Sequence, residues 1–340
     1  MKERQLIAYC MAKNLRKMTP EDAKMLDVIH VSFGLIKNGK IYIPYKAVSR
    51  EIERIREMNP NMRFVLSVGG WAADGFSQAA SGEAGRELLV RSGIELLKEL
   101  KLDGIDIDWE YPCNDAAGIA ASPEDKPNFT LLLQKFRQEL DTVSADKTLS
   151  IAAGGEAFFL DGVEMEKAAQ YLDYVQLMTY DLRGATRNIT GHHSNLFSYD
   201  DISDASTDKA VQVFMEAGVP KEKLVIGAAF YGRQWRGVKD TSESHGLGQP
   251  AQTTGSTFYG FDQIEAMLQD FGQGYRKYRD EQARAAWLYN GDSFISYEDK
   301  LALEEKARYA AENSLYGIMY WEYGQDGNHM LTKVLYDSIK

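Results

Sequence analysis

The stretch LDGIDIDWEYP, residues 102–112, alternates acidic and apolar side chains. In a β-strand, successive side chains point to opposite faces. The acidic side chains therefore share one face: Asp106, Asp108 and Glu110. The apolar side chains share the other: Ile105, Ile107 and Trp109. A strand of this kind suits a closed parallel barrel, because its apolar face can pack against the surrounding helices. Its acidic side chains then point into the barrel, in a row that leads to the C-terminal mouth, where such barrels carry their active sites.

The same short apolar run, followed by a longer amphipathic segment, recurs along the 340-residue chain. Eight runs are predicted to be strands: Leu6–Cys10, Val28–Gly34, Phe64–Gly70, Gly104–Trp109, Thr148–Ala153, Tyr174–Tyr180, Leu224–Tyr231 and Tyr316–Trp321. The intervening helices include Val48–Glu57, Glu83–Glu99, Asn128–Val143, Asp208–Glu216 and Tyr297–Ala311. This alternation predicts a (β/α)8 TIM barrel. The alternative is an open, doubly wound sheet, which the even spacing and the lack of a Gly-rich phosphate loop after the first strand disfavour.

One connection is too long for a single helix, because about 85 residues separate the seventh run from the eighth. We predict a single catalytic barrel over residues 1–340, with an inserted loop or small subdomain at residues 233–290. A loose surface excursion is the alternative. An ordered lid over one barrel mouth is favoured by aromatic residues that need burial: Trp235, Phe258, Tyr259, Phe261, Tyr275 and Tyr278.

Acidic residues outnumber basic ones by 50 to 39, for a formal charge of −11. This balance disfavours nucleic acids and anionic membranes as partners and suits a neutral ligand such as a sugar. No apolar stretch reaches the ~18 residues of a membrane helix, and residues 1–9 lack the apolar run of a signal peptide. We therefore expect a soluble chain, cytoplasmic as written or secreted if a leader was removed. Cys10 and Cys113 have no metal-binding spacing and are expected to be free thiols, with one disulfide as the alternative.

The acidic face of residues 102–112 calls for a chemical explanation, since acids are seldom buried without partners. Neighbours on this face lie about 6.6 Å apart at Cα. Three such acids cannot all stay ionised, so at least one pKa must rise. A hydrogen-bonded structural ladder and a cation site are the alternatives, but the ladder and the adjacent strand motifs lack histidine, and Ca²⁺ ligands usually come from loops. We interpret the acids as catalytic without metal or organic cofactor, with Glu110 at the open end as a general acid.

At this point the sequence resembles the family 18 glycoside hydrolases, the chitinases and their relatives. The segment DGIDIDWE, residues 103–110, matches the family signature Asp-x-x-Asp-x-Asp-x-Glu. Four further motifs match in the same order: SVGGW at 67–71, MTYD at 178–181, FYGR at 230–233 and MYWE at 319–322. The resemblance implies a retaining hydrolase of β-1,4-linked N-acetylglucosamine polymers, in which the substrate's own 2-acetamido oxygen is the nucleophile.

The resemblance also implies a role for each acid. Glu110 would protonate the glycosidic oxygen and then activate water, and Asp108 would orient the acetamido group and stabilise its positive charge. Asp106 would hold Asp108 and share its proton, whereas Asp103 has the opposite strand parity and is structural. Tyr180 would offer its hydroxyl to the acetamido carbonyl, with a core tyrosine as the alternative.

A second set of residues is expected to bind the sugar: Trp321, Trp71, Asp181, Met178, Tyr231, Arg233, Tyr9 and Phe33. By resemblance, Trp321 lies under the sugar at the scissile bond, and Trp71 stacks on the leaving-group side. The alternatives are a buried core position for Trp321, core packing for Tyr9 and Phe33, and a plain salt bridge for Arg233.

The sequence also departs from the family pattern. Many chitinases carry Pro-Trp after the segment that here reads DLRG (181–184), but this chain has Ala185-Thr186, so a stacking position beyond the cut is missing. Long-chain processivity is therefore not expected. His192 and His193 are left unassigned, since loop histidines are usually solvated. We expect a monomer that binds chitin or N-acetylglucosamine oligosaccharides. The alternatives are an endo-β-N-acetylglucosaminidase acting on N-glycan or peptidoglycan-type substrates, and a non-catalytic chitin-binding lectin.

Overall fold

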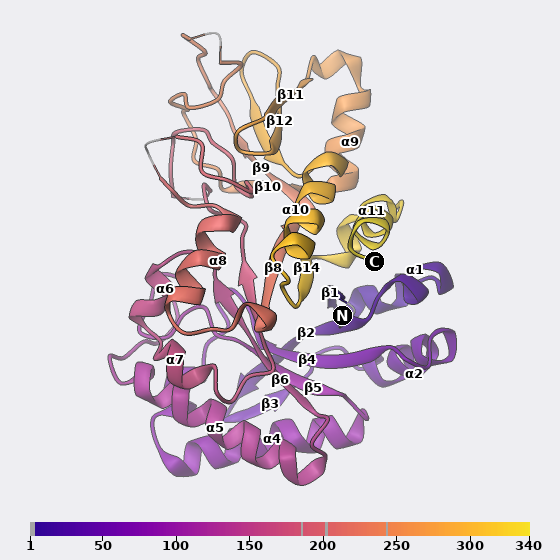
Figure 1. The fold of residues 1–340 in the computed structure, drawn as a ribbon, viewed down its shortest axis with the longest axis vertical. Helices are drawn as coiled ribbons and strands as arrows, with labels where there is room; N and C mark the ends of the chain where they lie inside the picture. The colour runs from indigo at the N-terminus through magenta and orange to yellow at the C-terminus, as the bar shows by residue number, and fades with distance from the viewer. Residues whose placement is uncertain (1–3, 185, 201–202, 243) are drawn as a thin grey trace.

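Eight parallel strands close into a barrel in the computed structural model, which describes residues 4–184, 186–200, 203–242 and 244–340 (Figure 1). Around the ring the strands are β1 (Gln5–Met11), β2 (Val28–Lys37), β4 (Arg63–Gly69), β5 (Gly104–Asp108), β6 (Thr148–Gly154), β7 (Tyr174–Met178), β8 (Leu224–Ala229) and β14 (Gly317–Trp321). β14 pairs with β1, and β1 pairs with β2, so the ring is closed. The predicted TIM barrel is confirmed, and the open doubly wound sheet is wrong. A short strand, β3 (Lys40–Tyr42), adds an antiparallel hairpin to β2.

Helices surround the barrel and follow the predicted segments closely. The longer ones are α2 (Val48–Met58), α4 (Glu83–Glu99), α5 (Asp125–Val143), α8 (Thr207–Glu216), α10 (Lys300–Glu312) and α11 (Met330–Ile339). The shorter ones around the barrel are α1 (Pro20–Met25), α3 (Phe76–Ala80), α6 (Phe158–Asp161) and α7 (Met165–Ala168). The helix predicted from Tyr297 begins only at Lys300, because the Asp299 side chain accepts a hydrogen bond from the Ala302 amide and caps the helix there.

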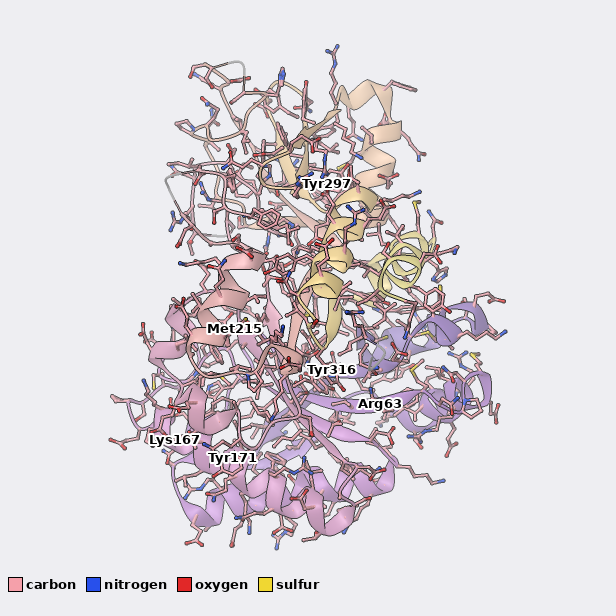
Figure 2. The ribbon with its side chains drawn as sticks, in the orientation of Figure 1. Arg63, Lys167, Tyr171, Met215, Tyr297 and Tyr316 are labelled. Carbon is pink, nitrogen blue, oxygen red and sulfur yellow. The ribbon has the colours of Figure 1, made fainter. Side chains whose placement is uncertain are left out.

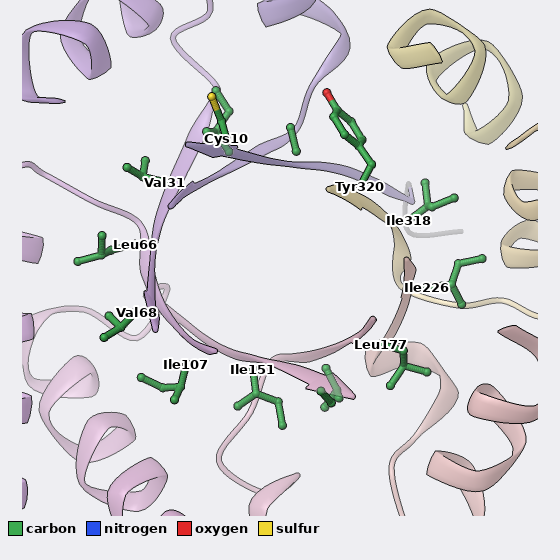
Figure 3. Close-up of a cluster of buried hydrophobic side chains, with 14 of the residues drawn as sticks. Cys10, Val31, Leu66, Val68, Ile107, Ile151, Leu177, Ile226, Ile318 and Tyr320 are labelled. Atoms are coloured by element: carbon green, nitrogen blue, oxygen red, sulfur yellow. The ribbon is translucent and has the colours of Figure 1, made fainter. Parts of the chain in front are cut away.

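The apolar strand faces make up the core between barrel and helices. Figure 3 shows these side chains pointing away from the centre of the ring, Ile107 of β5 among them. Trp109, which is 1% exposed, stacks on Phe76 at 5.2 Å between ring centroids and meets Phe129 edge-on at 5.6 Å. The alternation read from residues 102–112 therefore sends its apolar side chains to the helices, which leaves the acids for the interior.

Between β8 and β14 the chain builds a second, five-stranded antiparallel sheet. Its strands, in order, are β10 (Thr257–Gly260), β9 (Tyr231–Trp235), β13 (Phe294–Tyr297), β12 (Ala285–Tyr289) and β11 (Arg276–Asp280), accompanied by α9 (Phe261–Gln269). We call this segment the insertion sheet. Because β9 begins two residues after β8 ends, the sheet rises from the C-terminal mouth of the barrel, at the top of Figure 1. Tyr297, labelled at its base in Figure 2, is buried in the same apolar core as the barrel strands.

Burial within the insertion sheet differs from expectation at one aromatic residue. Trp235 and Phe261 are buried, but Phe258 is 58% exposed, so the expectation that it needs burial is wrong. Phe258 lies on the edge strand β10, where only one neighbouring strand can cover it. That the barrel and this segment form one catalytic unit stays a prediction.

Two expectations from composition concern the fold as a whole. Cys10 and Cys113 are free thiols, as predicted. No helix in the described ranges is both long enough and apolar enough to cross a membrane.

The buried Trp109 should contribute far more to stability than the exposed Trp71. We expect Trp109→Ala to lower the free energy of unfolding by about 3–5 kcal/mol, because it removes a large ring from a closely packed core. Trp71→Ala is the matched control: its ring is 63% exposed, and its loss should change stability by no more than about 0.5 kcal/mol. Urea denaturation measures both, and equal losses for the two variants would contradict this packing.

Candidate active site

Asp106 lies inside the barrel, fully buried, with its carboxylate satisfied by donors from the surrounding strands. It accepts hydrogen bonds from the Tyr9 hydroxyl at 2.9 Å, the Ser67 hydroxyl at 2.8 Å, the Ser150 hydroxyl at 2.7 Å and the Gln176 amide at 3.1 Å. His30 Nδ1 lies 3.4 Å from the same carboxylate. Burial by itself raises the pKa of Asp106, but His30 and the hydroxyl donors outweigh it, so the pKa is lowered. Asp106 is therefore a carboxylate at neutral pH.

Strand register explains why these donors meet Asp106. Ser67 of β4 and Ser150 of β6 are the direct register partners of Asp106, one on each side of β5. In parallel strands, partners at one level point to the same face of the sheet. Both hydroxyls therefore enter the barrel at the height of this carboxylate.

Asp108 and Glu110 lie higher on the same strand face and are less well satisfied. Asp108 is 4% exposed, and its Oδ1 has no hydrogen-bond partner among the described residues. Burial raises the pKa of Asp108 well above its ordinary value, and the charges of Glu110 and Asp106 raise it further. Burial also raises the pKa of Glu110 to about 7, helped by the charge of Asp181 and opposed by a hydrogen bond from Tyr111. The protonated form is thus favoured at the upper two positions of the acid ladder and disfavoured at Asp106.

Tyr180 follows the end of β7 and shares the pocket of the upper acids. Its hydroxyl lies 3.9 Å from the Met319 sulfur. Burial raises the pKa of Tyr180, and the charges of Asp108 and Glu110 raise it further, so the phenol stays protonated and can donate a hydrogen bond. The pocket thus combines two carboxyls of raised pKa with a phenol donor.

Asp181, the next residue, is held by two cationic or titratable side chains. Arg233 donates two hydrogen bonds to it, at 2.6 and 2.5 Å, and His193 Nδ1 lies 3.6 Å away. Partial burial raises the pKa of Asp181, but the hydrogen bonds from His193 and Arg233 dominate and lower it. Asp181 therefore presents a fixed negative charge at the mouth, with 40% of its side chain exposed.

The two loop histidines differ from expectation, because both are buried. His192 Nε2 pairs with Asp280 of β11 at 3.2 Å, and the His193 ring packs 5.1 Å from Tyr231 of β9. The assumption that loop histidines are solvated is wrong here, because the loop after β7 is covered by the insertion sheet.

Aromatic residues line the mouth on two sides. Trp321, at the end of β14, stacks on Phe33 at 5.4 Å with an interplanar angle of 18° and lies 6.1 Å from Tyr9. Tyr9 and Met178 are buried beneath it in one apolar cluster. Trp71, after β4, contacts Tyr111 at 6.5 Å between ring centroids and is otherwise open to solvent. The structure thus places the predicted site residues around one mouth, with Trp71 on a different side from Trp321, Phe33 and Tyr9. The missing stacking position predicted at Ala185 lies outside the described residues.

Sequence reasoning missed the ion pair between Lys306 and Glu298. The two charges lie 2.9 Å apart, with each side chain 1% exposed. Lys306 also donates to the carbonyl oxygens of Thr179, at 3.4 Å, and Gly227, at 2.8 Å. Lys306 of α10 therefore links the C-terminal ends of β7 and β8, next to Tyr180. No local signal marks this lysine, because its partners come from three separate segments.

His30 was missed for a related reason. It lies on β2, two strands away from β5, and its register partner is Tyr9 of β1. Strand parity could have found it, since a histidine on the inward face of a barrel strand needs a polar partner. No group of three or more His, Cys, Asp or Glu within the described part of the chain could hold a metal. Independence from cofactors stays a prediction.

Comparison with known proteins supplies independent findings. The family described as glycosyl hydrolases family 18 matches residues 5–326. Chitinase A1 of Niallia circulans is 35% identical over 310 residues, which cover 84% of this chain and 44% of that relative. A family 18 N-acetylglucosaminidase from Paenibacillus barengoltzii has a TM-score of 0.95 at 42% identity, covering 98% of this chain and 99% of that one. A chitinase from Paenibacillus sp. str. FPU-7 has a TM-score of 0.91 at 35% identity, covering 98% of this chain and 42% of that one.

The chain therefore spans less than half the length of the curated Niallia relative. It spans nearly all of the N-acetylglucosaminidase.

The raised pKa of Glu110 should make stability depend on pH. The folded protein binds this proton more tightly than the unfolded chain, whose ordinary value is 4.5. The resulting stability is present below that value and is lost as pH rises through about 7. Glutamine cannot ionise, so Glu110→Gln should gain about 1–3 kcal/mol relative to wild type between about pH 5 and pH 8. Denaturant unfolding at both pH values measures this, and a pH-independent difference would contradict the raised pKa.

Proposed function

The chain belongs to the glycosyl hydrolases of family 18, and from this premise we propose that it hydrolyses β-1,4-linked N-acetylglucosamine oligosaccharides by substrate-assisted catalysis. The observation that carries the proposal is the split protonation of the acid ladder. Asp106 is held as an anion, while the pKa of Asp108 is raised and that of Glu110 lies at about 7. A carboxyl that keeps its proton near neutral pH is what a leaving glycosidic oxygen requires.

The reaction follows from the heights of these groups. Glu110, at the mouth, donates its proton to the glycosidic oxygen as the bond to the anomeric carbon breaks. The 2-acetamido oxygen of the same sugar attacks that carbon, in keeping with the substrate-assisted route of this family. Asp108 passes its proton to the neighbouring Asp106 carboxylate and accepts a hydrogen bond from the acetamido N–H. The negative charge that Asp108 then carries offsets the positive charge that develops on the ring. The Tyr180 hydroxyl donates to the acetamido oxygen and orients it.

The second half of the reaction restores the enzyme. Glu110, now a carboxylate, takes a proton from water, which attacks the anomeric carbon from the side that the leaving group vacated. Two inversions at this carbon give net retention, so the first product is the β-anomer. Trp321 offers its ring to the apolar face of the sugar being cut, a stacking contact that suits a pyranose.

A second candidate is an endo-β-N-acetylglucosaminidase that acts on N-glycan or peptidoglycan-type substrates. It is favoured by the N-acetylglucosaminidase from Paenibacillus barengoltzii, which matches this chain over nearly its whole length. The chemistry at Glu110 would be the same, and only the bound units beyond the cut would differ. A non-catalytic lectin is disfavoured, because the acid ladder and Tyr180 are complete.

Incubation with N-acetylchitohexaose tests the proposal. We expect mass spectrometry to find shorter oligomers, which NMR should show as the β-anomer. A hexaose that is bound in calorimetry but not cleaved would instead favour the second candidate. Glu110→Gln should lower kcat by about 10²–10⁴-fold, because it removes the general acid. The exposed Glu124→Gln, on the loop after β5, should keep wild-type kcat.

The dependence of kcat on pH, measured in the same assay, tests the role of Glu110 a second time. For wild type, kcat should fall as pH rises through about 7, where Glu110 loses its proton. Wild-type turnover by Glu110→Gln, or release of the α-anomer first, would overturn the mechanism.

A further inference from the structure

Phe258 is a large aromatic residue that stays 58% exposed beside the barrel mouth. It lies on β10, directly opposite Arg233 of β9 in the strand register. Strand partners at one level share a face of the sheet. Arg233 reaches from this face to Asp181 at the mouth, so the face that carries Phe258 is turned toward the mouth as well.

Packing holds the Phe258 ring in place without covering it. The ring lies edge-on to Tyr231 at 6.2 Å, and Tyr231 lies in turn 6.1 Å from Tyr180. The Arg233 guanidinium is 5.9 Å from the centroid of Phe258 and 5.5 Å from that of Tyr231. Three aromatic rings thus run outward from the catalytic pocket, and the outermost ring is fixed by a cation–π contact.

The ring order of the strands places Phe258 across the mouth from Trp71. Trp71 follows β4, and β9 continues from β8. These two barrel strands are separated by β5, β6 and β7, which makes them opposite members of the closed ring. Each wall of the mouth therefore carries one exposed aromatic ring, and Glu110, after β5, lies between them.

We propose that Phe258 is a sugar-binding platform, which stacks on an N-acetylglucosamine unit lying next to the unit held over Trp321. The apolar face of a pyranose matches an exposed aromatic face, and binding sites combine such surfaces with a few polar groups. Here Asp181 and Arg233 supply the polar groups beside the ring. The platform extends the groove from the barrel onto the insertion sheet, and it rests on the proposed function.

Binding measured in a Glu110→Gln background tests the platform without turnover. Calorimetry with N-acetylchitotetraose and with monomeric N-acetylglucosamine compares Phe258→Ala with Phe271→Ala, whose ring is 96% exposed elsewhere in the same segment. We expect Phe258→Ala to weaken tetraose binding about 3–10-fold, as for loss of one aromatic stacking contact. A single unit held over Trp321 does not include the neighbouring unit, so monomer binding should stay within twofold of the background, as should binding by the Phe271→Ala variant. Phe258→Tyr should restore tetraose binding.

Each other outcome overturns the platform. If Phe258→Ala binds tetraose as tightly as Phe271→Ala while wild type hydrolyses N-acetylchitohexaose, the platform is wrong and the proposed function stands. If monomer and tetraose binding weaken equally and Phe258→Tyr does not restore either, Phe258 only supports Arg233. If wild type neither cleaves nor binds any of these oligosaccharides, the proposed function fails, and the platform fails with it.

Discussion

Three stacked carboxyl groups share a barrel interior that can satisfy only one of them as an anion. Asp106 accepts four hydrogen bonds and lies next to His30. Together these contacts lower the pKa of Asp106 by more than burial raises it. Asp108 and Glu110 lack a comparable set of donors, so burial and mutual repulsion raise the pKa of each. The three carboxyl groups therefore differ in pKa, because the neighbouring strands bring hydrogen-bond donors only to the level of Asp106. This difference in pKa decides which carboxyl keeps a proton and can act as an acid.

Barrel closure, a buried ion pair and the insertion sheet hold the groups around these carboxyls in place. Closure of the ring brings donors from β1, β4, β6 and β7 around one carboxylate. The buried Lys306–Glu298 pair ties α10 to the ends of β7 and β8, which fixes the turn that carries Tyr180 and Asp181. The insertion sheet then closes over that turn, supplying Arg233 to hold Asp181 and Asp280 to hold His192. Breaking a buried pair of this kind leaves a charge without a partner, so its residues are constrained by more than local packing.

Sequence alone predicted what depends on short-range alternation. The period of two in residues 102–112 placed three acids inside and Trp109 outside, and the recurring apolar runs gave the barrel. It did not predict contacts that depend on register between distant strands, such as His30 beside Asp106. Nor did it predict burial that depends on how the insertion sheet lies. That sheet buries His192 and His193, whereas Phe258 on its edge strand stays exposed. Burial of these residues depends on contacts with segments that are distant in the sequence.

Neutron diffraction from crystals grown in heavy water near neutral pH would test the central claim most directly, because it locates the exchanged protons on carboxyl groups. The account predicts deuterium on Asp108, partial deuterium on Glu110, and none on Asp106, whose oxygens accept deuterium bonds from Tyr9, Ser67, Ser150 and Gln176. Deuterium on Asp106, with Asp108 and Glu110 both bare, would contradict it.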